Sequence, residues 1–223
     1  YDDMAWLALA LERASSTAGV ERSKAMDKLR DQFLNSWVPE DGGGIPWRKQ
    51  DQFFNAPANG PAAIFLARYD RLRRAQQMSD WLEETLIDPE THLVFDGIKG
   101  GSMVRAQYTY CQGVVLGLET ELAVRTEDAD HAKRVHRLVA AVRDNMAPEG
   151  IIRGAGGGDG GLFNGILARY LALVATSLPQ NDDDDAKARD TASKLVLDSA
   201  QAAWDNRQTV EDLPLFAAFW ERA

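Results

Sequence analysis

The sequence is poor in cysteine and in long apolar runs. Its 223 residues contain a single cysteine, Cys111, which excludes an internal disulfide and a zinc site built from cysteines. No apolar run approaches the roughly 20 residues that a helix needs to cross a bilayer, so we expect no transmembrane segment. The chain opens at Tyr1 without an initiator methionine. We therefore expect upstream residues to be missing, and the cellular compartment stays open.

Basic residues and histidines are also scarce. The chain has 25 Lys and Arg against 34 Asp and Glu, and its net charge of −9 opposes binding to nucleic acid or anionic membranes. The histidines are His92, His131 and His136, and a five-residue step places the last two on different helix faces. No glycine loop carries the lysine of a phosphate-binding loop. We therefore expect no metal and no cofactor.

No stretch alternates at period two for long enough to predict a sheet. Apolar residues instead recur at steps of three and four, which is the helical period. The segments with this pattern are residues 4–11, 62–72, 114–122 and 162–173, and amphipathic segments run through 25–37, 75–86, 132–146 and 186–204. The sequence predicts one all-α domain over residues 1–223 with at least eight helices.

A repeat near fifty residues underlies these helices. Glycine-rich loops start at Gly42, Phe95 and Gly154, and each precedes a helix that opens with an amide and a glycine. The amides are Asn59, Gln112 and Asn164, spaced 53 and 52 residues apart, and Asp3 lies 56 residues before Asn59. Such helical hairpins stack as a solenoid or close as a ring, which would gather the helix starts around one mouth.

The helix starts have two interpretations. Amides and glycines are common at helix N-termini, which explains any one of them without a function. Four starts in register, with aromatic residues close by, favour a polar and aromatic cleft. Sugars suit such a cleft, because amides and carboxylates pair with hydroxyls and aromatic faces cover the C–H surface of the ring.

Asp2 and Asp3 are candidates for catalysis. Their Cα atoms are about 3.8 Å apart, which could place the carboxyls near the roughly 5–5.5 Å separation of a retaining glycosidase. Two close carboxylates resist double ionisation, so one can stay protonated while the other is an anion. The alternative is that the pair caps the helix and that its negative charge interacts favourably with the helix dipole.

Two other acidic segments carry weaker signals. Asp159 lies in a glycine-rich loop, but a single copy in a helical context argues against a calcium repeat. It could cap the next helix or hold sugar hydroxyls. The acidic run 182–185 is most simply a solvated loop and the start of the last helix, so we assign it no function.

Six segments carry a specific family pattern, in order from Tyr1 to about Leu173. They are YDDMAWLALALERA, GGGIPWRKQD, NAPANGPAAIFLAR, LVFDGI, YTYCQGVVLGLETEL and GDGGLFNGILARYLA. Together they resemble glycoside hydrolase family 76, the α-1,6-mannanases. The resemblance implies an (α/α)6 toroid and retaining hydrolysis of α-1,6-mannosidic bonds in an α-mannan polysaccharide or oligosaccharide. We expect endo action, although the sequence leaves the choice between endo and exo cutting open. It makes Asp2 the nucleophile and Asp3 the acid/base.

The resemblance further implies a substrate cleft lined by loops and helix starts. The residues carried over to that cleft are Trp47, Asn55, Asn59, Asp96, Tyr108, Tyr110, Gln112 and Asp159. Two features depart from the family. Cys111 stands where asparagine is frequent, and the eight expected helices are fewer than the twelve that six hairpins need, so the ring is expected to be incomplete.

Two other functions stay open on the sequence. A non-catalytic carbohydrate-binding toroid would use the same amides and aromatics. Another (α/α)6 sugar enzyme, such as an epimerase, would rely on histidine bases, and the three histidines lie outside the repeat starts. The sequence leaves the oligomeric state open.

Overall fold

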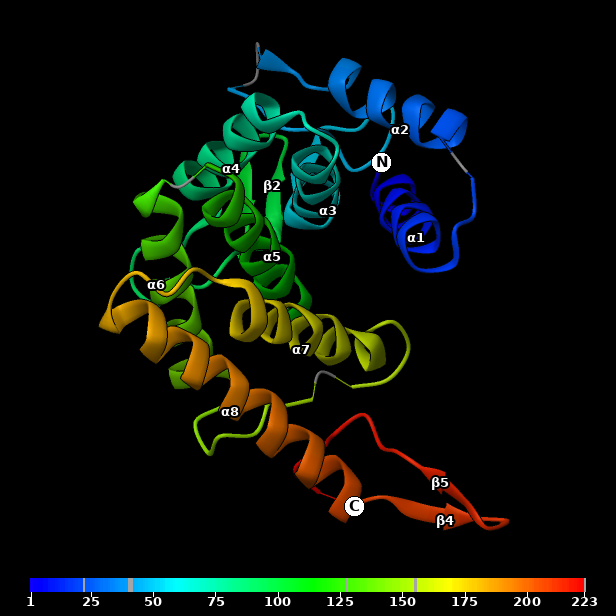
Figure 1. The fold of residues 1–223 in the computed structure, drawn as a ribbon, viewed down its shortest axis with the longest axis vertical. Coiled ribbons are helices and arrows are strands. Elements are labelled where there is room, and N and C mark those ends of the chain that lie inside the picture. Colours follow the sequence, from blue (N-terminus) through cyan, green and yellow to red (C-terminus); the bar gives the residue numbers. More distant parts are fainter. Residues whose placement is uncertain (22, 40–41, 127, 155, 223) are drawn as a thin grey trace.

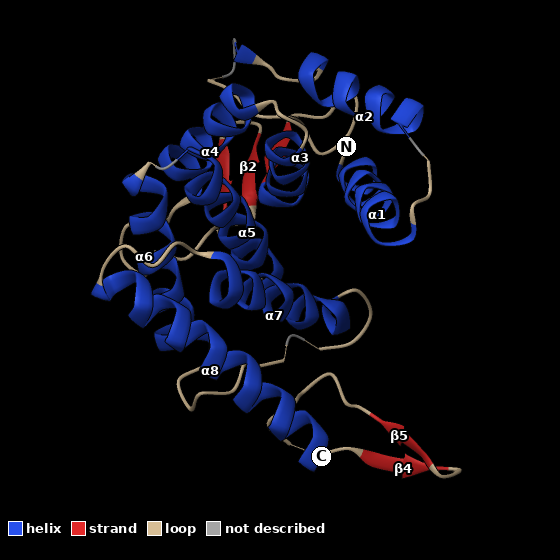
Figure 2. Cartoon of the chain, in the orientation of Figure 1, coloured by secondary structure: helices blue, strands red, loops and turns tan. Residues whose placement is uncertain are grey.

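The computed structural model describes residues 1–21, 23–39, 42–126, 128–154 and 156–222. Helices dominate this part of the chain (Figure 2), which confirms the all-α prediction of at least eight helices. They are α1 (Asp2–Ala18), α2 (Ser23–Asn35), α3 (Ala56–Arg68), α4 (Leu72–Leu86), α5 (Thr109–Thr126), α6 (Ala129–Met146), α7 (Gly160–Ser177) and α8 (Asp183–Asp205). Among the described helices, none is long and apolar enough to span a membrane.

The helices form four consecutive hairpins around an arc. The odd-numbered helices pack against one another in the order α1, α3, α5, α7, and each packs against the even-numbered helix that follows it. Figure 1 shows the odd-numbered helices on the inside of the arc and α2, α4, α6 and α8 on its outside. This is the inner and outer layering of a helical toroid.

Apolar patterning explains which helices lie inside. All residues from Ala56 to Ala67 on α3 are buried, as are residues 111–123 on α5. These two helices are apolar on nearly every side, which suits a helix covered by neighbours all round. The outer helices α4 and α6 bury one stripe and expose the opposite face, as the amphipathic pattern predicts.

The prediction that the chain contains no sheet is wrong. β1 (Phe53–Asn55), β2 (Gly97–Lys99) and β3 (Ser102–Val104) form an antiparallel sheet in that order, with Asn55 opposite Gly97. β4 (Gln208–Val210) and β5 (Leu213–Leu215) form a hairpin that extends away from the helices in Figure 1. Strands of three residues are too short to show alternation in the sequence.

Buried charges link the inner helices near their C-terminal ends. Arg68 on α3 donates to Glu121 on α5 at 2.7 Å and to Glu12 on α1 at 3.2 Å. The three side chains are largely covered, so each charge needs the others to offset its lost hydration. The cluster ties three helices together far from their N-terminal ends.

Candidate active site

The amides of the repeat hold loops in place. Nδ2 of Asn59 donates to the carbonyl oxygen of Ile45 at 2.8 Å, and Oδ1 accepts from the Ile45 nitrogen at 2.7 Å. Gln112 makes the same pair with Val94, at 2.9 and 2.6 Å. We call these two pairs the amide clamps, because each fastens the loop that precedes its helix.

The expectation that Asn59 and Gln112 line the cleft is therefore wrong. Both side chains are fully buried. Asn59 also donates to the Asn55 carbonyl, and Gln112 to the Tyr108 carbonyl. Their polar atoms are occupied within the protein, so neither is available to a ligand. Both amides lie in the first turns of helices that begin earlier than predicted, at Ala56 and Thr109.

Asn164, the third amide of the repeat, has a similar position on α7. Its Nδ2 donates to the carbonyl oxygen of Arg153 in the preceding loop at 3.0 Å, and its Oδ1 accepts from the Thr109 hydroxyl at 2.9 Å. The repeat seen in the sequence therefore marks how successive loops are anchored beside the N-terminal ends of the inner helices.

The fastened loops surround a cavity of about 640 Å³, which we call the main cavity. A volume of this size is typical of small-molecule sites. Its lining consists of Asp2, Asp3, Trp6, Trp47, Phe53, Asn55, Asp96, Tyr108, Tyr110, Asp159, Leu162, Phe163 and Ile166. Four of these are carboxylates, and no described lining residue is basic. The cavity therefore suits a neutral or cationic ligand better than an anion.

Asp2 and Asp3, which open α1, have different environments. Asp2 is half-buried, and its Oδ1 is covered without a hydrogen-bond partner in the described part of the chain. Burial raises the pKa of Asp2 from 3.8 to about 6, and the Trp6 and Trp47 side chains offset only part of this shift. Asp3 is exposed. The two neighbouring carboxyl groups thus lie in unlike surroundings, one largely covered and the other exposed.

Trp47 and Asn55 reach the main cavity from one loop and the strand that follows it. The backbone nitrogen of Tyr1 donates to the Trp47 carbonyl, and the Trp47 nitrogen donates to the Phe53 carbonyl at 2.7 Å. Asn55 is buried, and its Oδ1 caps α3 by accepting from the Ala58 nitrogen at 3.2 Å. Asn55 therefore borders the cavity and also has a structural role.

Asp96 is a third carboxylate in the main cavity. It is half-buried, and burial raises its pKa above the usual range, while the Cys111 thiol acts in the opposite direction. Cys111 Sγ lies 3.9 Å from Asp96 Oδ1 and is fully buried, so it contacts the aspartate without lining the cavity. Burial raises the pKa of the thiol well above its ordinary value, which keeps it protonated.

Three aromatic rings form one wall of the main cavity. Tyr110 stacks on Phe163 with ring centroids 4.1 Å apart, and Tyr108 meets Phe163 edge-on at 5.4 Å. Tyr108 is 40% exposed, so a large part of its ring is available to a ligand. Burial raises the pKa of Tyr110, whose hydroxyl therefore stays protonated.

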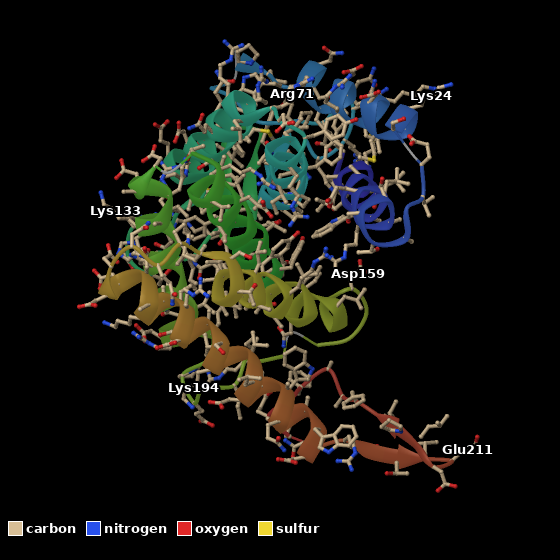
Figure 3. All side chains as sticks on the ribbon, in the orientation of Figure 1. Lys24, Arg71, Lys133, Asp159, Lys194 and Glu211 are labelled. Carbon is tan, nitrogen blue, oxygen red and sulfur yellow. The ribbon has the colours of Figure 1, made fainter. Side chains whose placement is uncertain are left out.

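Asp159 lies between α1 and the N-terminal end of α7 (Figure 3) and also borders the main cavity. It occupies the N-cap position of α7, but its side chain makes no capping hydrogen bond. The structure therefore does not support the interpretation of Asp159 as a side-chain cap. The exposed carboxylate stands at the rim, free to meet a ligand.

His136 lies in a cluster with two aspartates of the last hairpin. Its Nε2 lies 2.8 Å from Oδ1 of the buried Asp185, and Asp182 completes a group whose possible ligand atoms lie within 4.8 Å of one another. Asp185 also accepts from the Asn181 nitrogen, and Asp182 caps α8. These bonds account for the group as a contact between α6 and α8.

Sequence analysis missed several residues of the main cavity. Trp6 lies one turn after Asp2 on the same face of α1, and Ile166 lies one turn after Leu162 on α7. That four-residue spacing was a usable signal. Phe53 gave no signal, because its strand is only three residues long.

Comparisons with known proteins agree with this geometry. The α-1,6-mannanase GH76A from Salegentibacter sp. HEL1_6 is 30% identical with a TM-score of 0.87, covering 99% of this chain and 68% of that one. An inactive variant of it, with two consecutive aspartates replaced by alanine, was solved with α-1,6-mannotetrose (29% identity, TM-score 0.86, the same coverage).

A further similar structure is the Lin0763 protein from Listeria innocua, at 27% identity and a TM-score of 0.83, covering 100% of this chain and 65% of that one. This chain is thus shorter than these relatives. A comparison with curated proteins found no match. The profile of glycosyl hydrolase family 76 matches residues 1–217, so the chain belongs to that family, whose fold is a helical toroid.

Proposed function

We propose that the protein is a retaining glycosidase that cuts α-1,6-mannosidic bonds within a mannan chain, with Asp2 and Asp3 as its catalytic pair. The observation that carries this proposal is the position of the two adjacent aspartates in an acidic, aromatic-lined cavity of about 640 Å³. A neutral polyhydroxylated ligand fits that lining, because carboxylates accept from hydroxyls and aromatic faces cover C–H surface.

Asp2 is the nucleophile in this proposal. With a pKa of about 6, it is mostly ionised at neutral pH. Asp2 lines the main cavity, so a sugar bound there can present its anomeric carbon to this carboxylate. The attack forms a glycosyl-enzyme ester at Asp2 and breaks the bond to the leaving oxygen.

Asp3 is the acid and then the base. It gives its proton to the leaving glycosidic oxygen, and afterwards takes a proton from the water that hydrolyses the ester. Asp3 is exposed in the free protein.

A digestion of linear α-1,6-mannan by the protein tests the proposal. We expect a ladder of oligosaccharides, which indicates internal cutting, and proton NMR of fresh product showing the α-anomer first. Asp2→Asn and Asp3→Asn should each lower kcat by at least about a hundredfold, because each removes a group that reacts. β-Anomer appearing first would refute retention.

The rival is a non-catalytic toroid that binds the same glycan. It predicts that Asp2→Asn and Asp3→Asn change only the affinity for mannan, and that wild-type protein releases no reducing ends. The raised pKa of Asp2 speaks against it, because burying an ionisable group is costly in a site whose task is only to bind.

A further inference from the structure

A second cavity lies next to the main one. It has a volume of about 420 Å³, and its lining includes Leu93, Tyr108, Asn145, Met146 and Arg153. Tyr108 lines both cavities, so its ring forms a shared wall. An extended ligand that leaves the main cavity past Tyr108 therefore enters a second hollow rather than open solvent.

The second cavity has donors and acceptors that the protein does not use. Arg153 is exposed, and its guanidinium has no hydrogen bond or ion pair in the described part of the chain. Asn145 donates through Nδ2 to the Ala141 carbonyl at 2.9 Å, which leaves its Oδ1 free. Such side chains bind hydroxyl groups.

The floor and position of this cavity are fixed by the fold. Leu93 and Met146 are buried and apolar. The backbone of Arg153 is held on both sides, since its nitrogen donates to the Met146 carbonyl at 3.0 Å and its carbonyl accepts from Asn164. The Gln112 clamp holds Val94 beside Leu93. A ligand therefore meets a preformed surface.

We infer that the second cavity is a distal saccharide-binding subsite, which takes sugar units of the same α-1,6-linked chain beyond the units in the main cavity. The inference rests on the proposed function. The exposed face of Tyr108 covers a sugar ring at the junction, and Arg153 and Asn145 bind hydroxyls further along. Longer oligosaccharides then gain contacts that short ones cannot reach.

The test compares substrates of different length. The measured quantity is the ratio of kcat/KM for an α-1,6-linked mannohexaose to that for the mannotriose. One lost hydrogen bond corresponds to a factor of about three to ten. We therefore expect Arg153→Ala to lower this ratio by about threefold to tenfold, and Asn145→Ala by up to about threefold.

Arg143→Ala is the matched control. Arg143 is also an arginine near the end of α6, but it pairs with Asp144 at 2.6 Å and borders a different hollow. Its ratio should equal that of the wild type. A ratio that Arg153→Ala leaves unchanged would overturn the inference, and so would an equal fall with Arg143→Ala.

Calorimetric binding of the mannohexaose to Asp3→Asn protein, which should not consume the ligand, separates the two proposals. If the wild type cleaves neither oligosaccharide, the proposed function fails, yet weaker hexaose binding after Arg153→Ala is added to Asp3→Asn would still support the subsite. Equal hexaose affinities of Asp3→Asn protein with and without Arg153→Ala would refute the subsite, even if the wild type cleaves both oligosaccharides.

Discussion

Gly60 on α3 lies so close to Val114 on α5 that an added Cβ would come within 2.5 Å of Val114 Cγ2. Gly113 on α5 has the corresponding position against α7, where a Cβ would lie 3.0 Å from Leu167 Cα. Each glycine follows the amide of a clamp. The amide thus fastens the preceding loop, and the glycine admits the next inner helix.

Glycine substitutions should separate this packing role from helix propensity. We expect Gly60→Ala and Gly113→Ala to lower the free energy of unfolding by about 1–3 kcal/mol, because overpacking forces neighbouring atoms to shift. Gly165→Ala is the control, since a Cβ there meets nothing within 4 Å in the described residues. It should raise stability by up to about 1 kcal/mol through helix propensity. Urea unfolding measures all three.

The amide clamps should be structural and not catalytic. Asn59→Ala leaves the Ile45 nitrogen and carbonyl without their partners, and we expect it to cost about 2–4 kcal/mol of unfolding free energy. Gln112→Ala should cost a similar amount. Asn145→Ala, which loses one bond within a helix, is the comparison. Equal stability of Asn59→Ala and wild type would contradict the clamp.

The pH profile should reveal which aspartate attacks. If Asp2 is the nucleophile, kcat/KM falls as the pH drops through about 6, because protonation removes the anion. If Asp2 were the proton donor, kcat/KM would instead fall as the pH rises through about 6. Initial rates on mannotriose from pH 4 to pH 8 decide between the two assignments.

Asp2 should also lower the free energy of unfolding at neutral pH, compared with an uncharged residue at the same position. Its pKa is raised from 3.8 to about 6 in the folded state, so the folded state binds more protons between these values and stability falls as the pH rises through them. We expect Asp2→Asn to add about 1–2 kcal/mol at pH 7, after discounting for partial exposure, and nearly nothing at pH 3.5. Thermal unfolding at both pH values checks this.

Asp3→Asn is the matched control for that experiment. Asp3 is adjacent in sequence but exposed, so its replacement should change the unfolding temperature little at either pH. An increase in stability with Asp3→Asn as large as that with Asp2→Asn would contradict the assignment of the cost to burial.

The helices could be predicted because their patterns are long. An inner helix such as α3 has an apolar run that only burial on all sides explains, and the outer helices have a single apolar stripe. The short strands could not be predicted, since they form by pairing with distant segments. Phe54, for example, pairs with Ile98 across 44 residues.

The site was only partly predictable, for a related reason. Adjacent aspartates and nearby aromatics can be seen in the sequence. Whether an amide turns toward a loop or a cleft cannot, because the partners of Asn59 and Gln112 lie 14 and 18 residues away in the chain. The spacing of these amides could be read from the sequence, but their role as loop anchors could not.

The residues that anchor the loops, in the amide clamps, are different from the residues that line the main cavity. The side chains that fasten the loop backbones do not line the main cavity. Residues that do line it, such as Trp47 and Tyr108, can therefore be substituted without loosening the arc of helices. In such a protein, substitutions at the rim of the cavity alone can change the specificity for a glycan, while the fold stays the same.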